Sequence, residues 1–180
     1  MNIYFIGIVG GTGAGKSTLC HTLENLYPQS ISVVHLDDYH RTAEQVPTLF
    51  GMTNWDHPDA INFTQLIQDL TTLKSGKSIT VQTKDERANP TYKSIGRIPL
   101  RISPKQLILV EGYLVLWHPA VRELLDYAIY LDVAHARRMQ QRTKFQNKEY
   151  TEKILTPMHD QFVEPTKQYA DTVIDATGLS

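Results

Sequence analysis

The hydrophobic positions of the chain gather in short runs that predict buried strands separated by helices. Runs of four to seven residues that are apolar almost throughout are typical of strands covered on both faces. They lie at residues 3–9, 31–36, 107–110, 127–131 and 171–174. Helical patterns lie between them, at residues 16–26, 59–74, 119–125, 134–146 and 149–169. This alternation predicts an α/β fold with a five-stranded parallel sheet and helices on both faces.

Residues 76–105 break this alternation. Two segments there, ITVQT and RIPLRI, alternate apolar and polar residues around a polar connector. A period of two is typical of strands with one buried face, so we expect a β-hairpin inserted beside the main sheet. The whole chain has 180 residues, within the ~100–200 residues of a usual domain. We therefore expect one domain over residues 1–180.

Composition and charge narrow the classes of partner. The chain has 18 basic and 19 acidic residues and a net charge of -1, which does not favour nucleic acid as a partner. Its one cysteine, Cys20, cannot form a disulfide within the chain. The N-terminal segment MNIYFIGIVG resembles a strand and is too short for a signal peptide or a membrane span. These features predict a cytoplasmic enzyme or binding protein without membrane contact.

A glycine-rich loop between the first predicted strand and the first predicted helix carries the strongest motif. Its sequence GGTGAGKS fits G-x-x-x-x-G-K-[ST], with Gly10, Gly15, Lys16 and Ser17 at the fixed positions. Glycines let consecutive N–H groups surround phosphate oxygens, Lys16 reaches the β and γ phosphates, and the Ser17 hydroxyl ligates Mg²⁺. The loop therefore predicts a site for a nucleoside triphosphate and Mg²⁺. Its predicted nucleotide contacts are Gly11, Thr12, Gly13, Ala14, Gly15, Lys16, Ser17 and Thr18.

The loop alone leaves several classes of nucleotide-binding protein open. A GTPase would carry D-x-x-G and later N-K-x-D, but the run Asn147-Lys148-Glu149-Tyr150 lacks the final Asp. The D-x-x-G candidate, which begins at Asp175, also comes after that run and not before it. A kinase, an ATPase and a regulatory protein with little turnover remain, because a fold and a loop do not prove chemistry.

Acidic residues follow two of the predicted strands. The run VVHL leads into Asp37-Asp38, and LILV leads into Glu111. Ligands of open parallel sheets bind at the carboxyl ends of the strands, so these acids should meet the glycine loop. Asp37 is then a candidate base for an attacking hydroxyl, and Glu111 a candidate Mg²⁺ ligand. For the Asp pair, a role in capping or turn formation is the alternative.

The predicted helix at 134–146 offers positive charge. Arg137, Arg138 and Arg142 lie on it, and the last two are four residues apart and share a face. A transferring phosphoryl group requires such charge near its oxygens. A solvated basic face is the alternative.

Several segments resemble the uridine kinase family, within the wider uridine kinase and phosphoribulokinase group. GGTGAGKST resembles its phosphate loop, LDDYH its aspartate followed by aromatic residues, and NWDHPDA at 54–60 its N-F-D-H-P-D-A motif. The strand ending in Glu-Gly at 107–112 and the segment PMHDQFVEPTKQYAD at 157–171 match as well. The resemblance implies a three-layer P-loop kinase fold with a short lid at about 134–150. It also implies transfer of phosphate from ATP, with Mg²⁺, to a nucleoside 5′-hydroxyl.

The resemblance also implies roles for single residues. Asp37 looks like the catalytic base, assisted by Lys16 and the lid residue Arg142, and Ser17 and Glu111 look like the metal shell. The implied substrate contacts are Asp37, Tyr39, His40, Trp55, Asp56, Tyr92 and Arg142. A carboxylate such as that of Asp56 can accept hydrogen bonds from two vicinal ribose hydroxyls. By analogy with the family, a homo-oligomer is also an expectation.

The segments that would select the base depart from the family pattern. The hairpin reads YKSIGR and lacks the family's histidine, and His40 stands where the family usually has tyrosine. The segment between Arg142 and Pro157 is also shorter than the family's lid. Two acceptor classes therefore stay open. The first is uridine or cytidine, and the second is another small alcohol such as nicotinamide riboside, pantothenate or a sugar phosphate.

Overall fold

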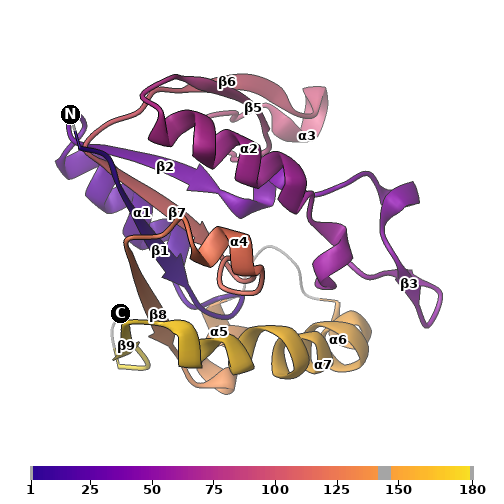
Figure 1. Cartoon of the computed structure of the whole chain (residues 1–180). Coiled ribbons are helices and arrows are strands. Elements are labelled where there is room, and N and C mark those ends of the chain that lie inside the picture. The colour runs from indigo at the N-terminus through magenta and orange to yellow at the C-terminus, as the bar shows by residue number, and fades with distance from the viewer. Residues whose placement is uncertain (1, 142–146, 179–180) are drawn as a thin grey trace.

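The computed structural model describes residues 2–141 and 147–178, and its centre is a parallel β-sheet (Figure 1). Five strands form the sheet in the order β2-β7-β1-β8-β9. Their bounds are β1 Tyr4–Val9, β2 Ile31–His35, β7 Leu107–Gly112, β8 Tyr127–Asp132 and β9 Thr172–Asp175. Each neighbouring pair is parallel. The predicted five-stranded parallel sheet is thus confirmed.

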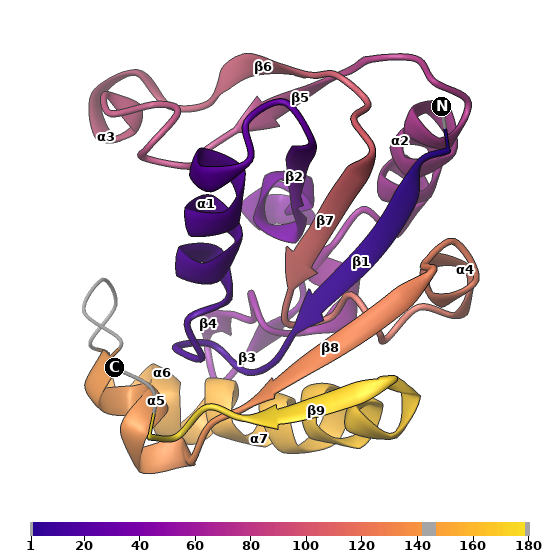
Figure 2. The same ribbon diagram turned by 90° about the vertical axis from the view of Figure 1, so that its left-hand side faces the viewer.

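Helices cover both faces of this sheet, which gives three layers. Along β1 successive side chains alternate between the faces, so Phe5 belongs to the buried cluster that includes Leu70 of α2, and Ile8 to the one that includes Cys20 of α1. The helices of the described chain up to residue 141 are α1 Lys16–Leu26, α2 Phe63–Lys74, α3 Tyr92–Ile95, α4 Pro119–Arg122 and α5 His135–Gln141. Figure 2 shows α1 on one side of the sheet and α2 and α4 on the other. No described helix combines the length and apolarity that a membrane crossing needs.

Two hairpins stand beside the sheet. Strands β5 Ile79–Thr83 and β6 Ile98–Ile102 pair antiparallel, with alternate residues of β5 buried, which confirms the hairpin predicted at 76–105. The second hairpin pairs β3 Thr48–Leu49 with β4 Met52–Thr53. The sequence pattern did not predict it, because two residues per strand are too few to show a period.

The helix predicted at 59–74 begins later than its apolar spacing suggested. Pro58–Ala60 forms one turn of 3₁₀ helix, and Ile61 then forms an isolated bridge with His40. That bridge requires extended backbone, so α2 begins only at Phe63. Asn62 caps it by accepting a hydrogen bond from the Gln65 N–H at 3.2 Å.

The helical segment predicted at 149–169 is present, but its turns are of mixed type. It contains α6 Lys148–Tyr150, π turns at Thr151–Leu155 and His159–Val163, α7 Thr156–Met158 and a 3₁₀ segment Glu164–Tyr169. Pro157 and Pro165 lie in it, and proline cannot donate a backbone hydrogen bond to the preceding turn. The helix predicted at 134–146 is seen as α5, and the rest of that prediction, residues 142–146, lies outside the described residues.

Candidate active site

The glycine loop lies between β1 and α1, as its motif predicts. Gly10, Gly13 and Gly15 all have positive φ angles, of 144°, 86° and 85°. A Cβ atom on Gly13 would collide with the backbone carbonyl oxygen of Arg138 in α5. Glycine is therefore required at position 13 both for its backbone angle and for the close approach of α5.

Lys16 begins α1 and turns back over this loop. Its Nζ donates a hydrogen bond to the Gly11 carbonyl oxygen at 3.1 Å, and the side chain is buried. Burial lowers the pKa of Lys16, while the carboxylates of Glu111 and Asp37 oppose that effect. The lysine charge thus lies at the loop and within electrostatic reach of both candidate carboxylates.

Glu111 of β7 gathers two neighbours at one carboxylate oxygen. The Ser17 hydroxyl donates to its Oε1 at 3.1 Å, and His35 Nδ1 lies 2.6 Å from the same atom. Burial lowers the pKa of His35, but the hydrogen bond and the charge of Glu111 outweigh it, so the pKa is raised. The predicted metal pair of Ser17 and Glu111 is therefore side by side and offers the oxygen atoms that Mg²⁺ prefers.

Asp37 follows β2 in the 3₁₀ segment Leu36–Tyr39 and keeps an accessible carboxylate, with 56% of its side chain exposed. Lys84 Nζ lies 3.7 Å from Oδ2, and His40 Nδ1 lies 3.8 Å from Oδ1. Loss of solvent around the carboxylate raises the pKa of Asp37, but the charges of Lys84, His40 and Lys16 outweigh this effect, so the pKa is lowered. The carboxylate is therefore ionised at neutral pH, as a proton acceptor must be.

The adjacent Asp38 has a different environment. Its side chain is buried, and Oδ1 accepts a hydrogen bond from the Lys84 N–H at 3.0 Å. Arg97 of the hairpin donates to the carbonyl oxygens of Asp38 and Gln82 at 2.7 and 2.8 Å. Asp38 thus fixes the β5–β6 hairpin to the segment that carries Asp37, and of the pair only Asp37 is open to a substrate.

Asp56 of the NWDHPDA segment meets the helical segment at the end of the chain. The Tyr150 hydroxyl donates to Asp56 Oδ2 at 2.7 Å and accepts the Trp55 N–H at 3.0 Å. The ring of Trp55 packs against the buried cluster that includes Tyr150 and lies edge-on to the ring of His40 at 6.0 Å. Asp56 and Trp55 are therefore held in place by residues far away in the sequence.

The Tyr113 hydroxyl contacts a residue beside each of the two carboxylates, His40 near Asp37 and Trp55 next to Asp56. The hydroxyl donates to the Trp55 carbonyl oxygen at 2.8 Å and lies 3.2 Å from His40 Nε2. Burial raises the pKa of Tyr113, and the charges of Asp56 and Asp37 raise it further. The candidate base and the candidate ribose ligand therefore both lie within electrostatic reach of this one buried hydroxyl.

Arg138 brings positive charge to the phosphate loop from α5. Its Nε donates to the Val133 carbonyl oxygen at 3.0 Å, and a Cβ atom on Gly11 would collide with its guanidinium. Its Nη1 is buried and has no hydrogen-bond partner in the described chain. Burial, and then the charge of Arg138, lowers the pKa of the adjacent His159 to about 4. The Arg138 guanidinium thus adds a second positive charge beside the loop, next to that of Lys16.

Three predicted contacts lie elsewhere or outside the described chain. The Tyr39 side chain is buried, and its hydroxyl donates to Asp69 of α2 at 2.9 Å. Tyr92 begins α3 in the hairpin, and no hydrogen bond joins its side chain to the described residues around Asp37. Arg142 lies outside the described residues. The roles predicted for these three residues stay predictions.

Tyr113, Tyr150 and Lys84 belong to this site and were not singled out from the sequence. Tyr113 does follow the strand-ending Glu-Gly pair, which is a usable signal for a residue at the carboxyl edge of the sheet. Nothing in the pattern marks Tyr150 or Lys84, since each reaches the site through folding of a distant segment.

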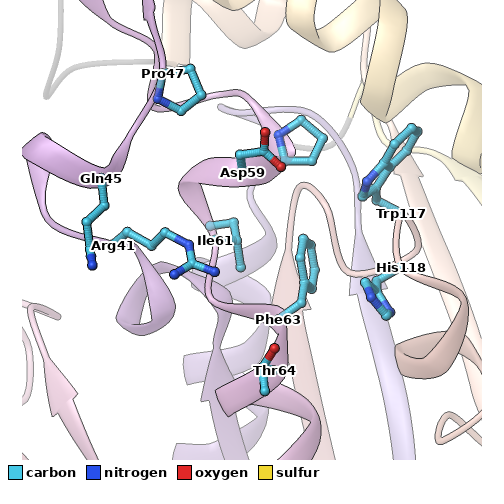
Figure 3. Close-up of a pocket in the computed structure, with 10 residues that line it drawn as sticks. Arg41, Gln45, Pro47, Asp59, Ile61, Phe63, Thr64, Trp117 and His118 are labelled. Atoms are coloured by element: carbon cyan, nitrogen blue, oxygen red, sulfur yellow. The ribbon is translucent and has the colours of Figure 1, made fainter.

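A hollow of about 530 Å³ lies beside this site and is lined by residues of a different set. Figure 3 shows Asp59, Phe63, Trp117 and His118 around it. None of the loop residues, nor Asp37, Asp56 or Glu111, is among its lining. The hollow is therefore separate from the point where phosphate loop and carboxylates converge.

A model of the "Phosphoribulokinase / Uridine kinase family" matches residues 5–179. The chain belongs to this family. It is 35% identical over 187 residues to "Uridine kinase" of Staphylococcus aureus strain JH9, and the same values hold for the protein of strain Newman. The match covers 96% of this chain and 87% of each relative.

A solved structure shares the fold. It is described as a "Possible Uridine Kinase" of Bacillus stearothermophilus, with a TM-score of 0.69 and 20% sequence identity, and the match covers 97% of this chain and 90% of that one. The phosphoribulokinase and uridine kinase family is a family of P-loop kinases, so the loop at residues 10–17 has the context that its motif requires.

Proposed function

We propose that this member of the family transfers the γ-phosphoryl group of ATP to the 5′-hydroxyl of a nucleoside, with uridine or cytidine as the first candidates. The observation that carries the proposal is the chain of contacts that brings Asp37 and Asp56 near each other. His40 lies 3.8 Å from Asp37 and 3.2 Å from the Tyr113 hydroxyl, which donates to the carbonyl oxygen of Trp55, next to Asp56. The 35% identity to uridine kinases supports the choice of a nucleoside.

The residues at the loop fit a nucleotide and a magnesium ion. Lys16 Nζ contacts a carbonyl oxygen of the loop, so a phosphate oxygen can replace that partner without a new cost of burial. Ser17 and Glu111 supply adjacent oxygen atoms that would hold Mg²⁺. When bound, Mg²⁺ neutralises charge on the β and γ phosphates. Arg138 holds a guanidinium against the loop, and Arg142 is proposed to add a second one from the lid.

The carboxylates of Asp37 and Asp56 have different roles toward the acceptor. Asp37 orients the attacking hydroxyl and accepts its proton, which its lowered pKa permits at neutral pH. Asp56 accepts hydrogen bonds from the vicinal ribose hydroxyls, and Tyr150 holds the carboxylate in position. The lid proposed at about 134–150 would exclude water, which otherwise competes as the acceptor.

Two observations favour a second acceptor class. His40 Nε2 lies 3.2 Å from the Tyr113 hydroxyl, at a position where the family usually has tyrosine. The β5–β6 hairpin also carries no histidine that could read a pyrimidine. A kinase of the same fold that acts on nicotinamide riboside, pantothenate or a sugar phosphate is therefore the alternative.

A panel of acceptors separates these proposals. ADP release should be measured with ATP and Mg²⁺ against uridine, cytidine, adenosine, nicotinamide riboside, pantothenate and ribulose 5-phosphate. Turnover on uridine or cytidine is the expected result. Turnover confined to a different acceptor would replace the pyrimidine assignment while keeping the kinase. ATP binding with no ADP release on any acceptor would favour a regulatory nucleotide-binding protein.

Asp56→Asn should weaken acceptor binding more than chemistry. A hydrogen bond to a charged acceptor contributes about 1.5–3 kcal/mol, so KM for the nucleoside should rise roughly 10- to 100-fold, with kcat changed much less. Asp59→Asn is the matched control, because Asp59 lies three residues away with 76% of its side chain exposed. Steady-state kinetics check this, and an unchanged KM in Asp56→Asn would refute the ribose role.

A further inference from the structure

Two histidines and an aspartate form a cluster outside the residues assigned to phosphoryl transfer. His21 comes from α1, His35 from the end of β2, and Asp85 from the segment just after β5. One potential ligand atom of each lies within 4.8 Å of the other two. Figure 2 shows α1 beside β2 with the β5–β6 hairpin above them, and the cluster joins these three segments.

The rings and the carboxylate are already close to a ligating arrangement. The two imidazole centroids are 5.0 Å apart, and His21 Nε2 lies 3.2 Å from Asp85 Oδ2. All three side chains are at least three-quarters buried, with exposed fractions of 13%, 10% and 21%. Ligands of a tetrahedral ion are separated by roughly 3.4 Å for bond lengths near 2.1 Å, so small side-chain rotations would complete the set.

The outer nitrogen of each ring faces a further carboxylate. His35 Nδ1 lies 2.6 Å from Glu111, which leaves Nε2 as its nitrogen for a metal ion. His21 Nδ1 lies 3.9 Å from Glu24, one turn along α1. Metal-bound histidines usually place their second nitrogen against a carboxylate, which fixes the ring and raises its basicity. This pattern is therefore a second and independent feature of a metal site.

We propose that His21, His35 and Asp85 bind one divalent transition-metal ion of the zinc class. Two imidazoles and one carboxylate suit zinc and its neighbours, whereas Mg²⁺ prefers oxygen ligands alone. Asp85, Glu24 and Glu111 place three carboxylates against the two rings, and the positive charges of Arg87 and Lys16 oppose them. The ion would fasten the β5–β6 hairpin to α1, and through His35 it would hold the carboxylate of Glu111 in place.

The direct test titrates tag-free protein, stripped of metal with a chelator, with Co²⁺ and then with competing Zn²⁺. We expect one equivalent of Co²⁺, with the visible absorption of a nitrogen- and oxygen-bound ion, displaced by Zn²⁺. Outer carboxylates alone alter metal affinity about 10- to 100-fold, so His21→Gln and Asp85→Asn should each weaken binding by at least about 100-fold. A rise in melting temperature with Zn²⁺, lost in both variants, is the second readout.

Two further variants locate the ion. His135→Gln removes an exposed histidine of α5 and should bind Co²⁺ as the wild type does. Ser17→Ala removes a ligand of the proposed Mg²⁺ site and should also retain Co²⁺. The proposal is overturned if Ser17→Ala abolishes binding while folded His21→Gln keeps it, or if wild-type protein binds no stoichiometric ion. Neither result depends on kinase activity, so the metal site is tested independently of the proposed function.

Discussion

Asp37→Asn should lower kcat by about 10²- to 10⁴-fold while nucleotide binding stays close to that of the wild type. General base catalysis contributes a factor of that order, and the amide of asparagine cannot accept the proton. The carboxylate is accessible, and Lys84, His40 and Lys16 lower its pKa, so it is ionised at neutral pH. No hydrogen bond joins the Asp37 side chain to a residue of the loop, all of which the structure describes, so ATP affinity measured by calorimetry should change little.

The neighbouring residue is the matched control for this experiment. Asp38→Asn keeps the Oδ1 atom that accepts the Lys84 N–H, and its side chain is buried behind the hairpin contact. We expect a reduction in kcat of less than about tenfold in Asp38→Asn, since it removes no group that touches the acceptor. A large loss in Asp38→Asn together with near-normal turnover in Asp37→Asn would move the base role to Asp38.

Gly13→Ala should abolish measurable ATP binding. An alanine there must adopt a φ near 86°, which costs about 1–2 kcal/mol, and its Cβ would collide with the Arg138 carbonyl oxygen. Backbone atoms cannot move aside as a side-chain tip can, so either the loop or α5 must shift. Such a shift misplaces the N–H groups that would surround the phosphates.

Gly76→Ala separates the backbone strain from the collision. Gly76 has a φ of 83°, and a Cβ atom there would meet nothing within 4 Å. The Gly76→Ala variant should therefore lose about as much stability in thermal unfolding as backbone strain costs Gly13→Ala. Its affinity for ATP should stay close to that of the wild type. Equal ATP affinities in Gly13→Ala and Gly76→Ala would show that the approach of α5 to the loop has no part in nucleotide binding.

The apolar runs predicted the sheet because a strand buried on both faces must be hydrophobic along its length. They could not predict the start of α2, since the bridge between Ile61 and His40 is a tertiary contact that overrides local spacing. They also could not reveal the π turns around Pro157.

The sequence predicted those residues of the candidate site that lie in a motif or at the end of a strand. The motif placed Lys16 and Ser17, and the strand end placed Glu111 beside them. The contacts of Tyr150 with Asp56 and of His35 with Glu111 join residues 94 and 76 positions apart. No period or spacing encodes such a pairing, so only the folded structure shows what orients the two carboxylates.

The central claim is transfer of phosphate from ATP to a nucleoside hydroxyl, and the product itself tests it most directly. Wild-type protein should be incubated with ATP, Mg²⁺ and uridine or cytidine, and the nucleoside fraction analysed by mass spectrometry. We predict a nucleoside 5′-monophosphate formed in equal amount to ADP, and its loss in Asp37→Asn. Protein that binds ATP but leaves both nucleosides unphosphorylated would contradict the account.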